Sequence, residues 1–383
     1  MSATRTFAAG YLESLLAGQP RWPASPLAWL NELRAEAVDR VGVLTVPTIR
    51  DEEWRFTDLS PLTKVTFQPA RTPACLKSAD VERFHIEEAT TRLVFVDGIY
   101  APELSSVAWD GGVVVANLSA AGAAHAAAIE SHLGRHVEFR DSVFAALNTA
   151  FLQDGALVVV PRDVSAAAPV HLLFIATQEG AASYPRCLLV AESGSTVTVV
   201  EDYVALQPET YFTNAVTEIA LGDRAHVDHI RVQRDSGQAF HIANCAVSLA
   251  NASCYRSVSV ALGARISRYD LNVLHTAEGA ECTIDGLALI GERQLADTHT
   301  CIDHAKPHGV SRQLHKCIAG GAAHAVFNGK IIVRPDAQRT NSSQSSRNLL
   351  TYAFGAEIID RIPVASLKHW LEQTVLEQTT RQP

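Results

Sequence analysis

Long apolar runs are missing from this chain of 383 residues. Stretches such as Ala156–Val160 are far shorter than the about 20 residues that a membrane-spanning helix requires, so we expect no membrane partner. The first residues lack the continuous apolar segment of a secretory signal peptide and carry Glu13 in their middle. This pattern predicts a protein that stays in the cytoplasm.

Positive charge is scarce. The chain has 32 Lys and Arg residues against 41 Asp and Glu, a formal net charge of −9, and no basic run offsets this balance. Proteins hold nucleic acid mainly through clustered positive charge, so we expect no nucleic-acid partner. Hydrophobic residues make up 47% of the chain, which excludes global disorder and predicts a sizeable core.

Cysteine pairs and common catalytic signatures are also missing. The seven cysteines are an odd number without a C-x-x-C motif, which predicts reduced thiols in a cytoplasm. The sequence has no G-x-S-x-G, H-E-x-x-H or G-x-G-x-x-G motif. Asn328–Ile331 resembles a phosphate loop only superficially, because Ile331 stands where Ser or Thr would hold Mg²⁺. We therefore expect no ATP hydrolysis by this chain.

The secondary structure that the sequence predicts changes along the chain. Up to about residue 60, positions such as Tyr11, Leu15, Leu33 and Ala37 follow helical spacing. From about Arg92, short strand-like runs follow one another, and after a short helix over 142–152 no ordinary helix separates them. This order excludes an alternating βαβ domain.

The turns between the strand-like runs recur. Gly194, Gly222, Asn251 and Gly279 lie about 28 residues apart, and each precedes small residues and then an apolar strand. Gly and Asn tolerate the positive φ that tight corners need. The pattern favours a β-solenoid, in which each coil buries its faces on its neighbours. An antiparallel sandwich with regular hairpins remains the alternative.

Helical spacing returns at the end of the chain. We expect one helix over 345–360 and, after Pro363, a second amphipathic stripe. Their apolar positions are Leu349, Phe354, Ile358, Leu367, Trp370 and Leu371. Such stripes can cap a solenoid or receive a partner protein.

The densest polar segment runs from Asp297 to His324. It contains five histidines and two cysteines, the ligand types that suit Fe, Zn and Cu, although their spacing matches no zinc finger. In a strand, Asp297, His299, Cys301 and Asp303 would share one face. Two interpretations stay open, a metal site and a ladder of hydrogen-bonded histidines on a solenoid face.

This segment resembles the SufB/SufD family of iron–sulfur cluster assembly proteins. The family pattern of a His-rich strand, Pro-His, Ser-x-x-x-x-Lys, V-F-x-G-K-I-x-V and A-Q-x-T is matched by Pro307-His308, Ser311 to Lys316, Val326–Val333 and Ala337–Thr340. Upstream, Arg50–Thr57 resembles the E-x-W-K/R-Y/F-T element of the SufD branch. The resemblance covers nearly the whole chain.

The resemblance implies a mainly β fold, a right-handed parallel β-helix with helical segments at both ends. The domains would be 1–90, an N-terminal helical domain; 91–345, the β-helix core; and 346–383, a shortened C-terminal helical segment. The chain would be a non-catalytic scaffold subunit linked to iron acquisition. It would pair with a SufB-like paralogue and bind one SufC-like ABC ATPase. Iron or an Fe–S cluster and a reduced flavin would belong to the complex rather than to this chain alone.

In this interpretation His299, Cys301, His304 and His308 would be metal ligands, and the apolar stripe from Leu349 to Leu371 would contact the ATPase. Two rivals stand against it. A β-helix enzyme acting on polysaccharide would need clustered acidic residues and usually a secretion signal, and neither is evident. A purely structural β-solenoid that polymerises through its ends would be blocked by flanking helices that cap those ends.

One departure from the family is large. Family members carry about fifty to sixty further residues between the N-L-L strand and the C-terminal helices, including a strand pair with a Cys and a His that face the SufB partner. Here Leu350 runs directly into Tyr352-Ala-Phe354. The resemblance therefore implies a chain that lacks this segment, pairs poorly with a SufB-like partner and tends to self-associate.

Overall fold

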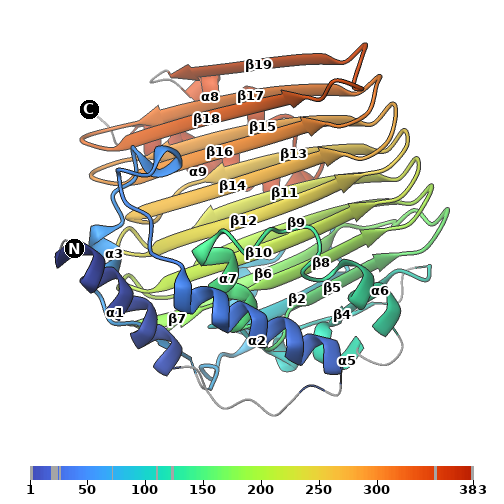
Figure 1. The fold of residues 1–383 in the computed structure, drawn as a ribbon. Helices are drawn as coiled ribbons and strands as arrows, with labels where there is room; N and C mark the ends of the chain where they lie inside the picture. Colours follow the sequence, from blue (N-terminus) through green and yellow to red (C-terminus); the bar gives the residue numbers. More distant parts are fainter. Residues whose placement is uncertain are drawn as a thin grey trace.

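The computed structural model describes residues 3–18, 25, 27–70, 72–108, 111–121, 125–348 and 352–380. Two N-terminal helices, α1 (Ala3–Ala17) and α2 (Ala28–Val43), lie beside the lower part of a tall stack of strands (Figure 1). The short helix α7 (Val143–Ala150) packs between α2 and the strands. Ser142 caps α7, its Oγ accepting the N–H of Ala145, as expected for a helix over 142–152.

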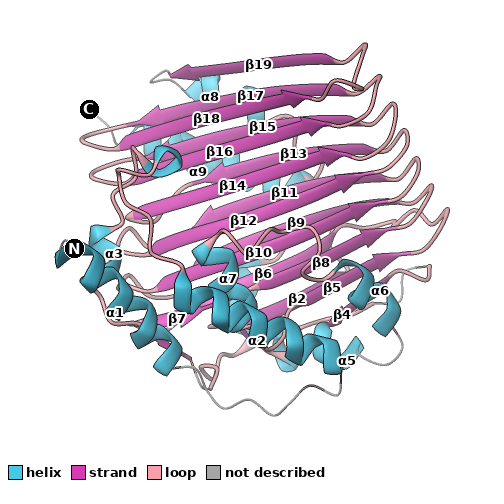
Figure 2. Cartoon of the chain, viewed as in Figure 1, coloured by secondary structure: helices cyan, strands magenta, loops and turns pink. Residues whose placement is uncertain are grey.

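The strands form two sheets that the chain visits in turn. Sheet A has the order β18-β16-β14-β12-β10-β8-β5-β4, with β1 and β7 beside it, and sheet B has the order β19-β17-β15-β13-β11-β9-β6-β2-β3. Neighbours from β5 to β19 pair in parallel, so each coil adds one strand to each sheet (Figure 2). The expected parallel β-helix is therefore confirmed and the antiparallel sandwich is excluded.

The strand bounds are as follows. Sheet A contains β1 (Gln68–Pro69), β4 (Val114–Asn117), β5 (Ala156–Val160), β7 (Ala181–Ser183), β8 (Arg186–Ala191), β10 (Phe212–Leu221), β12 (Phe240–Leu249), β14 (Ile266–His275), β16 (Leu295–His304) and β18 (His324–Val333). Sheet B contains β2 (Thr91–Val96), β3 (Ile99–Tyr100), β6 (Val170–Ala176), β9 (Thr196–Ala205), β11 (His226–Arg234), β13 (Cys254–Ala261), β15 (Glu281–Ile290), β17 (Val310–Ala319) and β19 (Asn341–Asn348).

The corners of the coil repeat one hydrogen bond. At the corners that lead from sheet A to sheet B, a residue with positive φ donates its N–H to a carbonyl of the next coil, as Gly194 does to Asp223 (2.8 Å) and Ala252 to Glu278 (2.9 Å). The expectation that Gly222 and Asn251 would take these conformations was wrong. Arg224 and Ala252 take them instead, because stacking of the corner backbone sets the position more strongly than residue type.

Apolar side chains fill much of the space between the two sheets, together with buried polar residues such as Glu201, His229 and His304. Both outer faces are partly covered. The N-terminal helices and α7 pack on sheet A around Phe212 and Phe240. At the other end of the chain, α8 (Tyr352–Ile359) and α9 (Ala365–Thr380) pack on the outer face of sheet B. These two helices cover a flank, so the expectation that they cap the solenoid end was wrong.

The end of the solenoid is formed by β18 and β19. Residues Asn341–Asn348 pair one by one with Val310–Cys317, which corrects the expectation of a helix starting near residue 345. Backbone pairing with β17 extends the sheet where helical spacing alone suggested a helix. Among the described strands, β18 pairs only with β16 and β19 only with β17, so each offers one open edge. None of the described helices is both long and apolar enough to cross a membrane.

Candidate functional site on the outer face of sheet A

Strand β16 divides the histidine-rich segment between two faces. Asp297, His299, Cys301 and Asp303 point outward, as expected from strand alternation, whereas Ile302 belongs to the core between the sheets. Outward residues of β14 lie beside them in register, with Asp270 opposite His299. Two of the four predicted metal ligands, His299 and Cys301, lie on this outer surface of β14 and β16.

The segment 44–59, here called the N-terminal strap, crosses this surface (Figure 1). Arg268 of β14 fixes it, because its Nη1 donates to the Glu53 carbonyl at 2.9 Å and its guanidinium lies 4.4 Å from the Trp54 ring centroid. The same Nη1 bonds Asp297 at 2.6 Å, and Thr57 Oγ1 donates to that carboxylate as well. The E-x-W-R-F-T element therefore anchors the strap to the coil.

His299 stands between two carboxylates. Its Nε2 lies 3.0 Å from Asp297 Oδ1, and its Nδ1 lies 3.3 Å from Glu53 Oε2 of the strap. Burial raises the pKa of Asp297, but the hydrogen bond from His299 and the charge of Arg268 outweigh it and bring the pKa below its usual value. Asp297 is therefore ionised, and each ring nitrogen of His299 lies beside a carboxylate oxygen.

Cys301 lines a hollow of about 200 Å³ together with Glu53, Asp270, His299 and Lys330. Burial raises the pKa of the Cys301 thiol, and the charge of Lys330 only partly opposes this, so the thiol is neutral near pH 7. The hollow thus contains a thiol, an imidazole and carboxylates, but each ring nitrogen of the imidazole already lies beside a carboxylate oxygen.

The other two predicted ligands lie elsewhere. His304 points between the sheets, where its Nε2 is 3.0 Å from Ser311 Oγ and its ring is 4.2 Å from that of His275. His308 is exposed at a corner with φ of 62°. Within the described ranges no three His, Cys, Asp or Glu side chains are placed to hold a metal ion. The four predicted ligands therefore do not form one site, and this arrangement does not fit a resident metal.

The predicted partner-binding stripe is largely internal. Ile358, Leu367 and Leu371 are buried against the outer face of sheet B, and Trp370 lies over the Arg234 guanidinium at 4.1 Å. Ion pairs from Glu357 to Lys316 and from Arg361 to Asp285 hold α8 on the same sheet. Leu349 lies outside the described residues, as does the side chain of Phe354. The apolar stripe thus serves the chain's own packing.

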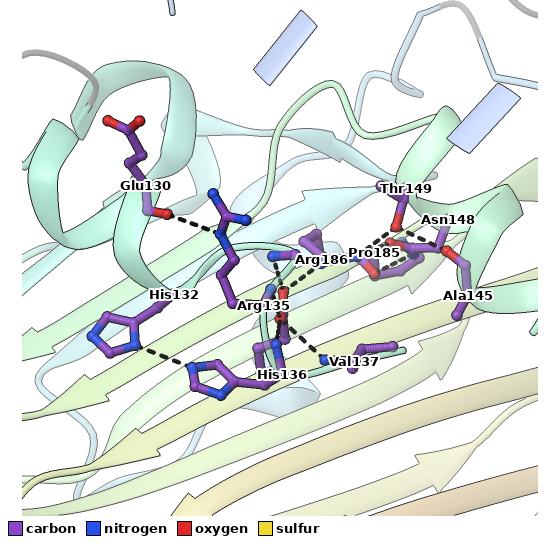
Figure 3. Close-up of polar contacts among 12 residues, drawn as sticks. Glu130, His132, Arg135, His136, Val137, Ala145, Asn148, Thr149, Pro185 and Arg186 are labelled. Carbon is purple, nitrogen blue, oxygen red and sulfur yellow. Dashed lines mark hydrogen bonds and ion pairs between the residues drawn. The ribbon is translucent and has the colours of Figure 1, made fainter. Parts of the chain in front are cut away.

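Sequence reasoning missed the buried polar clusters, of which the one around Glu218 is drawn in Figure 3. Glu218 of β10 accepts backbone N–H bonds from Gly134 (2.7 Å), Arg135 (3.0 Å), His136 (2.8 Å) and Val137 (3.3 Å), and it forms an ion pair with Arg186 of β8. Burial raises the pKa of Glu218, but Arg186 and these N–H groups outweigh it and lower the pKa. These residues are scattered over more than eighty positions, so no motif could have marked them.

Comparisons with known proteins give concordant matches over most of the chain. The model of the SUF system FeS cluster assembly SufBD core domain matches residues 174–355, and that of the SufBD protein N-terminal region matches residues 20–172. A SufBD family iron–sulfur cluster assembly protein of Synechocystis is 40% identical over 83% of this chain and 72% of its own length.

Two relatives are named SufD. The iron–sulfur cluster assembly protein SufD of Escherichia coli is 29% identical over 80% of this chain and 70% of its own length. That of Bacillus subtilis is 24% identical, over 84% and 76% respectively.

Proposed function

The chain belongs to the SufBD family of iron–sulfur cluster assembly proteins, and we propose that it acts there as a non-catalytic, SufD-like scaffold subunit. In this proposal it works in the cytoplasm, pairs with a SufB-like paralogue and binds a SufC-like ABC ATPase. All seven cysteines are free, which fits a reducing compartment. The SufD-like assignment draws support from the strap, where Trp54 and Thr57 of the E-x-W-R-F-T element contact Arg268 and Asp297 of the coil.

The open end of the solenoid is the observation that carries the pairing proposal. Among the described strands, β18 and β19 each have one side without a partner strand, and residues 341–344 are exposed. Unpaired N–H and C=O groups on a long strand are a template for strands of another chain. A paralogue built from the same coils could continue both sheets across such an end.

The join between Leu350 and Thr351 bears on this pairing, although it lies outside the described residues. A chain without the family's extra strand pair would present fewer strands to the partner. We therefore expect weaker pairing with a SufB-like subunit than a full-length relative shows, together with self-association through the same open edges.

We propose that the ATPase contacts the outward side of α9 and not its apolar stripe. Because Leu367 and Leu371 are buried on sheet B, a partner would meet exposed positions such as His369 and Gln373. Replacing both with Glu should reduce co-elution with a SufC-like ATPase while leaving the melting temperature unchanged, since both side chains already contact water. A matched double replacement at exposed Arg312 and His324, on other elements, should leave co-elution intact. Equal co-elution of all variants would place the ATPase site elsewhere.

Iron handling at the hollow beside Cys301 is proposed for the assembled complex, with iron as cargo rather than a resident cofactor. In the free chain the Glu53 carboxylate of the strap contacts the His299 ring, so release of the strap would expose the imidazole next to the thiol. Replacing His299 by Ala and Cys301 by Ser should lower the iron retained by the complex, and His308→Ala should not. If His299 serves only to fix the strap, the melting temperature would fall and iron content would follow the folded fraction. A bound reduced flavin stays a prediction for the complex.

A further inference from the structure

Two histidines face each other at the end of α6 (Ala126–His132) (Figure 3). His132 Nδ1 and His136 Nε2 are 3.1 Å apart, the ring centroids are 5.3 Å apart, and the ring planes differ by 17°. Both side chains are partly exposed. The pair lies at a different place from the hollow beside Cys301 and has no part in the function proposed above.

The pair is held in place by buried structure. His132 is the last residue of α6, and the N–H of His136 donates to Glu218 Oε2 at 2.8 Å. Glu218 is fully buried and fixed by Arg186, so the loop between the two histidines is pinned to sheet A. Because the two rings are already held close together, binding a common ligand costs less entropy.

The charge state and the surroundings both favour a cation. Burial lowers the pKa of His132 and of His136, and in His132 the neighbouring His136 adds to this, so both rings are neutral near pH 7. His136 also lines a hollow of about 700 Å³ whose wall contains the carboxylates of Asp51, Glu138 and Asp141. Clustered negative charge at a concave surface raises the local concentration of cations.

We propose that His132 Nδ1 and His136 Nε2 together bind one divalent first-row transition-metal ion, with water as the remaining ligands. For metal–nitrogen bonds of about 2.1 Å, nitrogens 3.1 Å apart subtend an angle of about 95° at the ion. This angle suits neighbouring positions of an octahedron, and imidazole is a preferred ligand of Ni, Fe, Cu and Zn. The proton now shared between the two nitrogens moves to the far nitrogen of its own ring, so binding releases no net proton.

The competing explanation is an ordinary N–H···N hydrogen bond between neutral rings. It predicts no saturable metal binding at this place. The two explanations differ in the number of ions bound and in the effect of binding on the loop, because an ion that joins the rings would also protect the N–H groups of residues 134–137 from exchange.

The test uses the full chain after treatment with a chelator and Ni²⁺ as the probe. Calorimetric titration should show one more saturable Ni²⁺ per chain in the unmodified protein than in either His132→Ala or His136→Ala. The controls His308→Ala and His369→Ala, at exposed histidines elsewhere, should retain that ion. Circular dichroism and melting curves verify folding, and His136→Gln serves if the alanine variant unfolds.

Hydrogen exchange gives the second readout. Ni²⁺ should slow exchange of the amides of residues 134–137 in the unmodified chain and in neither variant. Equal Ni²⁺ stoichiometry in the unmodified chain and both variants would overturn the proposal. Loss of the ion in only one variant would also overturn it, because the site would then not be the pair.

Discussion

Replacing His315 by Gln should make the protein less sensitive to acid. The His315 ring lies between the sheets, stacked on Phe327 with centroids 4.0 Å apart and seated over Gly286, where a Cβ would meet the ring at 2.2 Å. Its Nε2 has no hydrogen-bond partner among the described residues. Burial lowers the pKa of His315 to about 3, whereas a histidine in an unfolded chain has a pKa of about 6.5.

The sign and size of the effect follow from this difference. As pH falls below about 6.5, the unfolded chain takes up a proton that the folded chain refuses, so the free energy of unfolding decreases until the pH approaches about 3. Between about pH 7 and about pH 5, His315 should account for a loss of about 2 kcal/mol. The loss comes from the position of one ring and not from the net charge of the protein.

Urea unfolding at these two pH values measures the loss directly. The unmodified chain should lose about 2 kcal/mol more than His315→Gln between them. His369→Gln, whose side chain is 73% exposed, serves as the control and should behave like the unmodified chain. If His315→Gln loses as much stability as the unmodified chain, the ring is not held neutral inside the coil and the reasoning is refuted.

Three further predictions concern packing and charge. Leu371→Ala, beneath α9, should cost about 2–5 kcal/mol of unfolding free energy in chemical denaturation, because it opens a cavity against sheet B. Arg268→Leu leaves Asp297 ionised and buried and should cost about 3–5 kcal/mol; Arg334→Leu, at an exposed ion pair, should barely move the melting temperature, and equal effects would contradict the strap geometry. Hydrogen bonding to Asp228, and to a smaller extent to Cys254, raises the pKa of His226 to about 9. Its stabilisation should be full below about pH 6.5 and lost as pH rises through about 9, so a deficit in His226→Gln that persists at about pH 10 would refute it.

The strand-rich core and its repeat could be predicted from the sequence because both depend on local signals. Short apolar runs punctuated by Gly, Asn and Asp indicated the strands, and the repeat of about 28 residues favoured a solenoid without excluding an antiparallel sandwich. The parallel pairing followed only from the family resemblance. Strand alternation explains one failure. His299 and His304 are five positions apart, an odd number, so a strand must send them to opposite faces, and one metal site could not contain both.

Other features depend on tertiary contacts that no local signal carries. Amphipathic spacing marked the apolar stripe of α8 and α9 but could not tell a partner protein from the chain's own sheet, and the structure assigns Leu371 to the sheet. The Glu218 cluster joins β10, β8 and a loop more than eighty residues away, so only the fold brings its members together. The corner residues Arg224 and Ala252 take positive φ because hydrogen bonds to the next coil require it.

The most direct test of the scaffold role is the mass of the assembly formed with a SufB-like and a SufC-like subunit, measured by light scattering. Two chains should be compared, this one and the same chain with a family-like segment inserted between Leu350 and Thr351. The account predicts that the extended chain enters a complex with one SufB-like and two SufC-like subunits, and that the unmodified chain enters it more weakly and partly self-associates. Failure of both chains to associate with the SufB-like subunit at any concentration would contradict the account.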